Sequence, residues 1–399
     1  MYHMLAMSHS SKVGATQSQS YDVVVVGARC AGAATAMLLA RRGLRVLVVD
    51  RERYGADTLS THALMRGGVL QLHRWGILDG VKAAGTPTVS STAFHYGDEV
   101  VEIQIKPKEG IDGLYAPRRK VIDPLLVDAA RSAGAEVLYE TRLMDLLRRD
   151  NRVCGARLRS ADGEHFEVTA ELVIGADGVR STVADLVGAE PYKTGRHATG
   201  VVFSYWAGAN ITGYHWCYRP GVSVGVIPTN DDLVCVFVSV AQSRFHDEVG
   251  ADVGAGYQRL LKECNPRLGA VVERASRMEK YRGFAGQVGF FRQSNGPGWA
   301  LVGDAGYFKD PLTAHGMTDA LIDAELLAQA ATQGSESALA EYQRVRDDRA
   351  MALFEVTDAI ASYDWDLTRV AELHRSLSDE MKKENAAVAK WSPDRRSGG

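Results

Sequence analysis

The sequence predicts an α/β fold in which a Rossmann-like domain is interrupted by a β-rich domain and followed by C-terminal helices. Three observations predict this arrangement. A strand–helix–strand pattern fills residues 21–50, short alternating strands fill 88–105 and 199–240, and apolar residues recur at helical spacing from Met317 to Ala331. With 399 residues, 46% of them hydrophobic, the chain is long enough for two domains.

The Rossmann-like unit begins with a β-branched run, Tyr21 to Val26, that ends in glycine as a buried parallel strand does. An alanine- and leucine-rich helix is predicted from Ala31 to Arg42 and is closed by Gly43. Arg45 to Asp50 is the second strand. These elements form one βαβ unit of about 30 residues.

Later elements follow from the same patterns. Pro124 to Ala133 is predicted to be a helix, and Val153–Leu158 with Phe166–Val168 a hairpin. Beyond Ser337 the pattern is helical, and a polar tail follows Trp391.

The composition excludes several classes of partner. A formal net charge of −3 leaves no excess of basic surface, so we expect no nucleic acid and no membrane partner. The most apolar stretch, Val23 to Ala40, contains Arg29 and lacks the unbroken run of about 18 apolar residues that a membrane span needs. Residues 1–20 lack a signal-peptide pattern, and we interpret them as the disordered tail of a cytoplasmic protein.

The cysteines predict neither a metal site nor a redox pair, because no C-x-x-C motif is present. Widely spaced cysteines are typical of buried thiols in a reducing compartment. The five are Cys30, Cys154, Cys217, Cys235 and Cys264.

The first motif, Gly27 to Gly32, lies where the first strand meets the first helix. Gly27 permits a tight turn, Gly32 lets the helix approach the strand, and the helix N-terminus offers amide donors to a pyrophosphate. Asp50, 23 positions after Gly27, can accept hydrogen bonds from ribose hydroxyls. We therefore predict a dinucleotide site that includes Asp50 and the adjacent Arg51.

Arg29 stands where this motif usually has its middle glycine. One hypothesis is that the guanidinium helps to neutralise the pyrophosphate. The alternative is a solvent-facing arginine that a slightly wider loop tolerates.

The second motif, Leu172 to Ser181, is an apolar strand that runs into the turn Gly-Ala-Asp-Gly-Val-Arg-Ser. This stretch resembles the second fingerprint, G-A-D-G-x-R-S, of the p-hydroxybenzoate hydroxylase-like (group A) flavoprotein monooxygenases. The resemblance implies FAD as cofactor and a GR2-type FAD-binding domain. It also implies that Asp177, with Arg180 as a second candidate, lies near the FAD pyrophosphate and the approach of NAD(P)H.

The resemblance extends over roughly residues 21–330 and suggests a division of the chain. We expect a disordered tail at 1–20, a discontinuous FAD-binding domain at 21–87, 118–190 and 285–335, a β-rich substrate domain at 88–117 and 191–284, and a C-terminal helical segment at 336–399.

Two further positions are implied by the resemblance. Arg119 begins a stretch that looks like the family's R-x-x-L-x-x-x-L helix start, whose arginine reaches the FAD, and Arg118 is the alternative. Leu143 occupies the place where the family's backbone meets adenine.

The third motif, Trp299 to Gly306, is followed by Pro311 and by a helix start near Ala314. A carboxylate at the strand end can accept from a ribitol hydroxyl, and amides at a helix N-terminus suit the edge of a reduced flavin. The stretch is similar to the family's G-D-A…P…G-x-G. Ala314 and Thr318 replace the family's usual glycine and asparagine, so backbone contacts are expected and side-chain contacts stay open. The implied FAD contacts are Gly303, Asp304, Pro311, Ala314, Gly316 and Met317.

The implied reaction is hydroxylation of a small aromatic or apolar substrate by O2 through a flavin C4a-hydroperoxide, with NADPH or NADH as reductant. The cofactor performs the difficult step, so no protein nucleophile is expected. The catalytic residue is not identified. His315 and His62 are candidates for moving protons, and Lys309 is either a charge near the flavin or a solvated residue.

Aromatic residues on alternate positions of the β-rich domain are candidates for the substrate pocket, and core packing is the other interpretation. They are Phe203, Tyr205, Trp216 and Tyr218. The C-terminal helices could form a homodimer interface.

Other functions on this scaffold stay open: a halogenase, although its W-x-W-x-I-P segment is missing, a geranylgeranyl reductase-like C=C reductase, or a non-catalytic flavin-binding protein.

Overall fold

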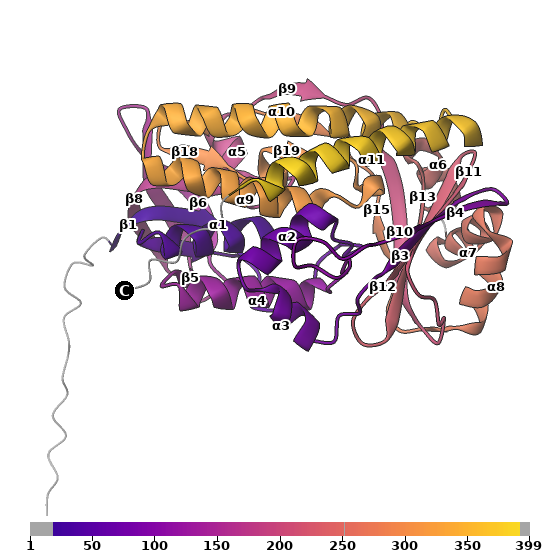
Figure 1. Ribbon diagram of the computed structural model, residues 1–399. Helices are drawn as coiled ribbons and strands as arrows, with labels where there is room; N and C mark the ends of the chain where they lie inside the picture. The colour runs from indigo at the N-terminus through magenta and orange to yellow at the C-terminus, as the bar shows by residue number, and fades with distance from the viewer. Residues whose placement is uncertain (1–18, 251, 392–399) are drawn as a thin grey trace, which may run out of the picture.

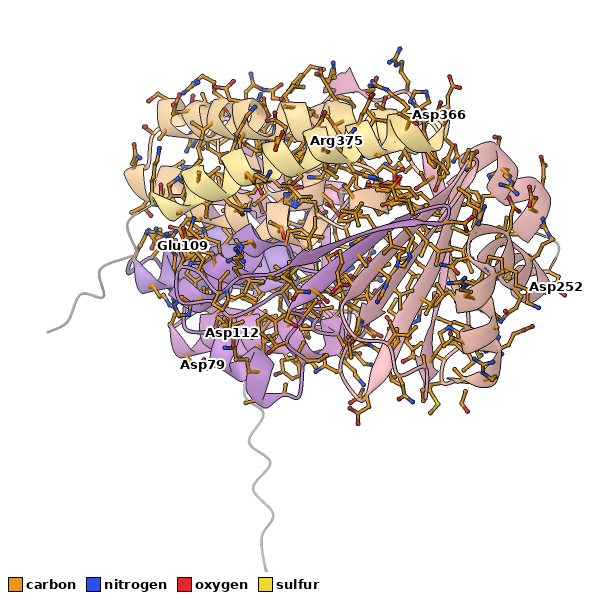
Figure 2. The ribbon with its side chains drawn as sticks, turned by 45° about the vertical axis from the view of Figure 1, so that its right-hand side comes forward. Asp79, Glu109, Asp112, Asp252, Asp366 and Arg375 are labelled. Carbon is orange, nitrogen blue, oxygen red and sulfur yellow. The ribbon has the colours of Figure 1, made fainter. Side chains whose placement is uncertain are left out.

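The computed structural model describes residues 19–250 and 252–391. Figure 1 shows two large sheets at opposite ends of the molecule, with α10 (Glu336–Ala361) and α11 (Leu367–Ala389) lying along one side of both. In Figure 2 the labelled charged side chains, all of them exposed, point outward: Asp79, Glu109, Asp112, Asp252, Asp366 and Arg375.

The first sheet is built around β1 (Gln19–Val26), which pairs in parallel with β2 (Val46–Val49) and with β8 (His165–Gly175). Its central residues are buried on both faces because helices or further strands cover them. The strand order is β17-β18-β8-β1-β2-β5, where the outer strands are β5 (Glu136–Leu138), β17 (Asn295–Gly296) and β18 (Trp299–Leu301).

The predicted βαβ unit is confirmed, with α1 at Cys30–Arg41. β1 begins at Gln19, inside the tail predicted for residues 1–20, because the long β8 supplies a backbone partner for these two polar residues. The rest of that tail lies outside the described residues. The predicted hairpin is also confirmed, since β7 (Arg152–Arg159) pairs antiparallel with β8 and with β6 (Arg142–Arg149).

α4 (Arg119–Ser132) begins five residues before the predicted start at Pro124, which was wrong. The early start is stabilised by an ion pair between Arg119 and Asp123, one turn apart, at 3.0 Å. Pro124 is tolerated because it lies near the N-terminal end, where it removes a single helical hydrogen bond.

The second sheet joins two distant segments of the chain, because β11 pairs in parallel with β3. Its order is β14-β10-β13-β12-β11-β3-β4, with β15 beside β10. The strands are β3 (Ser91–Tyr96), β4 (Glu99–Gln104), β10 (Thr199–Ala207), β11 (Tyr214–Arg219), β12 (Val222–Pro228), β13 (Leu233–Ala241), β14 (Ser276–Arg277) and β15 (Arg282–Phe284).

Three helices that the sequence patterns did not predict cover one face of this sheet: α6 (Gln242–Val249), α7 (Val253–Cys264) and α8 (Pro266–Arg274). A third, small sheet contains β9 (Pro191–Thr194), β16 (Phe290–Arg292) and β19 (Tyr307–Phe308). Residues 191–194 therefore pair outside the second sheet. The exact domain boundaries stay a prediction.

The remaining elements are helical. None of the helices in the described ranges is long and apolar enough to cross a membrane. The predicted tail after Trp391 lies outside the described ranges. These elements are α2 (Arg66–Arg74), α3 (Leu78–Ala83), α5 (Thr182–Val187), the 3-10 turns η1 (Gly303–Ala305) and η2 (Pro311–Thr313), and α9 (Gly316–Gln333).

Candidate cofactor and substrate site

The turn between β1 and α1 has the close packing that its glycines predict. Gly27 adopts a φ of +107°, and a Cβ on Gly32 would lie 1.9 Å from the Gly27 carbonyl oxygen. The Asp50 carboxylate accepts hydrogen bonds from the Ala28 amide at 2.7 Å and the Glu52 amide at 2.8 Å. In the described structure no side chain caps α1 and no acid lies in its first turn, so this N-terminus suits an anion.

A small hollow of about 10 Å³ lies beside this turn. Arg29 borders it and donates to Ala56 O at 3.3 Å and Asp123 Oδ2 at 3.4 Å, so it is held at the mouth rather than extended into solvent. Arg51 is exposed and pairs only weakly with Glu52, at 3.6 Å. The lining residues are Ala28, Arg29, Asp50, Glu52, Arg53, Gly55, Ala56, Asp123 and Tyr139.

Of the two predicted arginines, Arg119 is the one that lies near the first motif, because it pairs with Asp123 beside the hollow. Its Nε donates to both oxygens of Asp123, at 3.0 and 3.1 Å. Burial raises the pKa of Asp304 to about 6, repulsion from Asp319 adds to the rise, and the charge of Arg119 opposes it. Arg118 instead stacks on the ring of Tyr205, 3.8 Å from its centroid. The first and third motifs are adjacent, since a Cβ on Gly303 would lie 2.9 Å from the Ala31 Cβ.

In the second motif, Asp177 holds the start of α5. Its carboxylate accepts from Ser181 Oγ at 2.5 Å and from the Val183 amide at 3.2 Å, and burial raises its pKa. Arg180 is exposed, and Leu143 is buried in the apolar cluster below the sheet. The strands of the first two motifs are nonetheless adjacent in the sheet.

The third motif leads to an open helix start. Ala314 has a φ of +52°, the left-handed conformation that explains why a glycine is usual there. Gly316, the first residue of α9, is exposed, and no heavy atom of the described chain lies within 4 Å of its would-be Cβ. Pro311 is exposed and Met317 half-buried, while Gly303 is buried at a φ of +61° against Ala31.

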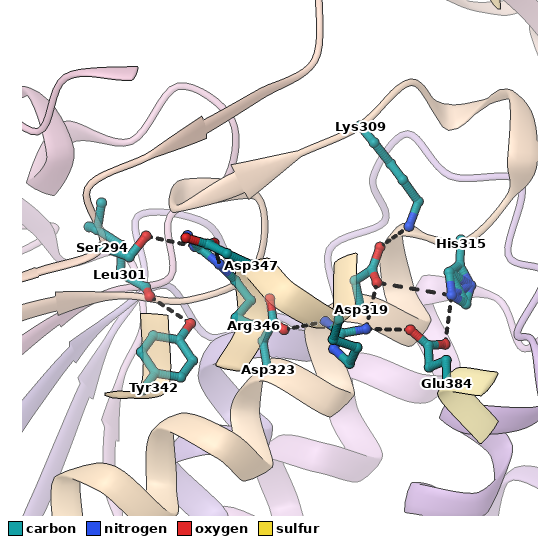
Figure 3. A network of polar contacts seen from close by, with 11 residues as sticks. Ser294, Leu301, Lys309, His315, Asp319, Asp323, Tyr342, Arg346, Asp347 and Glu384 are labelled. Carbon is teal, nitrogen blue, oxygen red and sulfur yellow. Dashed lines mark hydrogen bonds and ion pairs between the residues drawn. The ribbon is translucent and has the colours of Figure 1, made fainter. Parts of the chain in front are cut away.

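Behind this helix start lies a buried network of charges that ties together four parts of the chain (Figure 3). Lys309 donates to Asp319 and is buried, so it is not the solvated residue that was one alternative. Arg349 contacts Glu384 and donates to Asp323 at 2.7 Å.

His315 joins this network through Nε2, which lies 2.8 Å from Glu384 Oε1. His315, Asp319 and Glu384 come close enough to suggest a metal site. Their carboxylates, however, already pair with Lys309 and Arg349, so we interpret the group as an ion-pair network.

A cavity of about 230 Å³ lies between the second sheet, the η2–α9 segment and α11. Of the four predicted pocket residues, Trp216 and Tyr218 line it, whereas Phe203 and Tyr205 do not and are buried in the main core. The cavity also has walls that carry no sequence motif, in α10 and α11. Its lining comprises Met65, Arg66, Thr92, Phe94, Ile103, Ile105, Leu114, Tyr214, Trp216, Tyr218, Leu312, Thr313, His315, Ile360, His374, Leu377, Ser378, Met381 and Asn385.

The two candidate histidines are both buried, and only His315 lines this cavity. His62 Nε2 bonds to the Tyr205 hydroxyl, and its φ of +69° reflects a tight loop. Burial lowers the pKa of each histidine to about 3, so both rings are neutral near pH 7.

Comparison with known proteins identifies the family. Residues 20–357 match the protein family described as FAD binding domain. The chain belongs to this family. It is an FAD-dependent oxidoreductase, and the match runs from β1 into α10.

Two relatives of this flavoprotein have different activities. It is similar to digeranylgeranylglycerophospholipid reductase 2 of Methanococcoides burtonii, with 28% identity over 341 residues that cover 81% of this chain and 79% of the relative. It is also similar to aklavinone 12-hydroxylase RdmE of Streptomyces purpurascens, with 31% identity over 224 residues that cover 50% of this chain and 42% of the hydroxylase.

Solved structures share the whole fold. The flavin-dependent brominase Bmp2 has a TM-score of 0.77 and 17% identity, with coverage of 95% of this chain and 96% of the brominase. PqsL of P. aeruginosa, solved with 2-aminobenzoylacetate, has a TM-score of 0.74 and 22% identity, with coverage of 90% and 100%. The predicted FAD-binding fold with a β-rich domain and C-terminal helices is therefore confirmed.

The residues present fit FAD. The uncapped α1 N-terminus suits the pyrophosphate, Asp50 lies beside it for the ribose, and the exposed Gly316 leaves room at the start of α9 for the flavin ring. Contact of each individual residue with FAD stays a prediction. Tyr139 and Asp123 also border the hollow and were missed, because nothing in their local sequence marks them.

Proposed function

We propose that this flavoprotein is a monooxygenase that uses NADH or NADPH and O2 to hydroxylate a small, flat, largely apolar molecule. The observation that carries the proposal is the cavity at the start of α9. Leu312, Thr313 and His315 line it, and they belong to the segment whose backbone is expected to face the flavin. A molecule in the cavity would therefore lie next to the reactive part of FAD.

The shape and chemistry of the cavity support a ring-shaped substrate. Trp216, Tyr218 and Phe94 form aromatic walls, and aliphatic side chains such as Leu377 and Met381 close the opposite side. An apolar cavity of about 150 Å³ can hold a benzene molecule, so about 230 Å³ accommodates one or two rings. Flat apolar ligands favour such walls.

When bound, FAD supplies the electron transfer and the activation of oxygen. The chain's own residues bind FAD and the substrate and orient them toward each other. The α1 N-terminus attracts the pyrophosphate, and the amides at the start of α9 can stabilise negative charge at the flavin edge. α11 forms one wall of the cavity, and its apolar side chains exclude water that would otherwise compete in the reaction.

A second candidate function is reduction of a prenyl C=C bond. The similarity to digeranylgeranylglycerophospholipid reductase over 81% of the chain favours it. The cavity size argues against it, because a geranylgeranyl chain of about twenty carbons needs far more room than the six carbons of benzene in about 150 Å³.

Anaerobic reduction followed by oxygen would distinguish these functions. The holoenzyme is reduced with NADH or NADPH in the presence of a panel of one- and two-ring aromatic compounds or a geranylgeranyl lipid, and then ¹⁸O2 is admitted. We expect an aromatic product that carries one ¹⁸O atom. A lipid product heavier by two hydrogens, formed without oxygen, would establish the reductase. Halide incorporation would establish a halogenase, and a flavin that no reductant reduces would favour a non-catalytic protein.

A further inference from the structure

The second sheet ends in a strand whose outer edge is unpaired. β4 is the last strand of the sheet order, and within the described chain it pairs only with β3. The Ile105 amide donates toward β3, to Ser90 O at 2.7 Å. Backbone groups alternate in direction along an antiparallel strand, so those of Val100, Glu102 and Gln104 point away from β3. No other described part of the chain binds them.

The edge of β4 is regular and apolar. Edge strands are commonly protected from other chains by a proline, a bulge or a covering loop. β4 contains no proline, and its register with β3 is uninterrupted. All six of its residues are exposed, and Val100, Val101 and Ile103 are 41–52% exposed. Such an edge favours pairing with another strand.

The edge is complementary to itself in one antiparallel register. When Ile103 lies opposite the partner's Ile103, Val101 lies opposite the partner's Ile105. In the same register Glu102 lies opposite the partner's Gln104, so a carboxylate meets an amide. Directly opposite side chains share a face of the sheet, so the apolar residues also contact one another. The outward backbone groups of Glu102 and Gln104 then bond to the partner.

The charges on the edge favour this register as well. The Glu102 carboxylate accepts only from Gln104 Nε2, at 2.8 Å, and the exposed Lys106 forms no ion pair with any described residue. Pairing about Ile103 places Glu102 diagonally across from the partner's Lys106, at about 7–8 Å, a distance that long side chains bridge.

The two neighbouring registers are less favourable. Pairing about Glu102 would set two carboxylates directly opposite each other, which is destabilising. Pairing about Gln104 would require the Lys106 carbonyl, which already accepts from Arg66 Nη2 at 2.8 Å.

We propose that β4 is the interface of a homodimer, in which two β4 strands pair antiparallel about Ile103 and join the second sheets of two copies into one continuous sheet. The interface adjoins the cavity, because Ile103 and Ile105 line it. The partner's Ile103 covers the exposed side of this part of the cavity wall. The inference does not depend on which reaction the flavoprotein catalyses, and it differs from a dimer built on the C-terminal helices.

Sedimentation equilibrium of the holoenzyme tests the dimer at concentrations from about 1 to about 200 µM. We expect the average mass to rise from 43.3 kDa toward twice that value. Gln104→Pro removes an outward N–H and keeps the bonds to β3, so it should weaken dimerisation at least about tenfold. Gln104→Ala keeps the N–H and should weaken it less. Val101→Lys, which places a charge against the partner's Ile105, should also weaken it and serves if the proline variant does not fold. The mass of a single chain at every concentration, or an unchanged dimer in the folded variants, would overturn the proposal.

Disulfide formation tests the register. Ile103 lies on the two-fold axis, where opposed Cα atoms of a non-hydrogen-bonded pair are about 4.5 Å apart, within the range of a disulfide. Mild oxidation of Ile103→Cys should therefore yield a covalent dimer. Val100→Cys is the matched control on the same strand, because its two copies lie about 20 Å apart. Wild type controls for the native cysteines. A cross-link at Val100 instead of Ile103, or a dimer that neither variant cross-links, would place the interface elsewhere and overturn the proposal.

Discussion

Two positions of the cofactor site require glycine for different reasons. A Cβ on Gly32 would collide with the Gly27 carbonyl oxygen at 1.9 Å, whereas a Cβ on Gly316 would enter open space. We expect Gly32→Ala to destabilise the apoprotein by about 1–3 kcal/mol or more in urea unfolding. Gly316→Ala should keep the apoprotein stability and lower FAD affinity, because its methyl group meets the flavin. Equal effects of the two variants on stability would contradict this distinction.

A second residue-scale prediction concerns Arg29, which pairs with Asp123 at the mouth of the hollow. If its guanidinium turns toward the pyrophosphate when FAD binds, Arg29→Ala should lower FAD affinity about tenfold, the worth of a charge-assisted hydrogen bond. Arg157 on β7, which belongs to none of the three motifs and does not line the hollow, provides the control, since Arg157→Ala removes the same charge. Fluorescence titration of the apoprotein with FAD measures both. An unchanged affinity in Arg29→Ala would favour the alternative of a merely tolerated arginine.

At the scale of elements, the buried charge network fixes α11 against α9 and α10. Arg349 contacts three carboxylates, on Asp319, Asp323 and Glu384, so removing it leaves buried charges without a partner. We expect Arg349→Met to cost about 3–5 kcal/mol in urea unfolding. Arg344→Met, on the same helix but at the surface, is the control and should leave the midpoint unchanged. Similar midpoints for both variants would mean that the network does not stabilise the helix.

For the whole molecule, buried titratable groups make the free energy of unfolding depend on pH in opposing directions. Burial lowers the pKa of His374 to about 3, below the unfolded value of about 6.5, so its contribution to stability is present above pH 6.5 and is lost as the pH falls toward 3. Burial acts in the opposite sense on three carboxyls, because it raises their pKa to about 6. Their contribution to the free energy of unfolding is therefore lost as the pH rises through 6. These carboxyls belong to Asp304, Asp310 and Asp323.

Removing one histidine separates these effects. Relative to wild type, His374→Phe should gain about 1.4 kcal/mol of unfolding free energy for each pH unit below 6.5. Urea unfolding at pH 7.5, 6.5, 5.5 and 4.5 measures the difference. Parallel curves for the two proteins would contradict a neutral, buried His374.

The candidate site was only partly accessible to sequence reasoning. Gly27, Gly32 and Asp50 were predictable because a turn, a close approach and a strand-end carboxylate are local features with fixed spacing. Asp177 was expected near the cofactor, yet its carboxylate is occupied by Ser181 and Val183 at the start of α5. The atoms that a side chain contacts depend on where other helices and strands lie, and the spacing of residues in the sequence does not determine that.

The sequence by itself determined the βαβ unit, the open start of α9 and the family, because hydrophobic periodicity and glycine spacing act within a few tens of residues. Tertiary structure alone decided the cavity, which needs β11, α9 and α11 together. It also decided the contact between His315 and Glu384, which are 69 positions apart and meet only when α11 packs over α9. Such contacts arise from the packing of whole elements, and no local pattern encodes them.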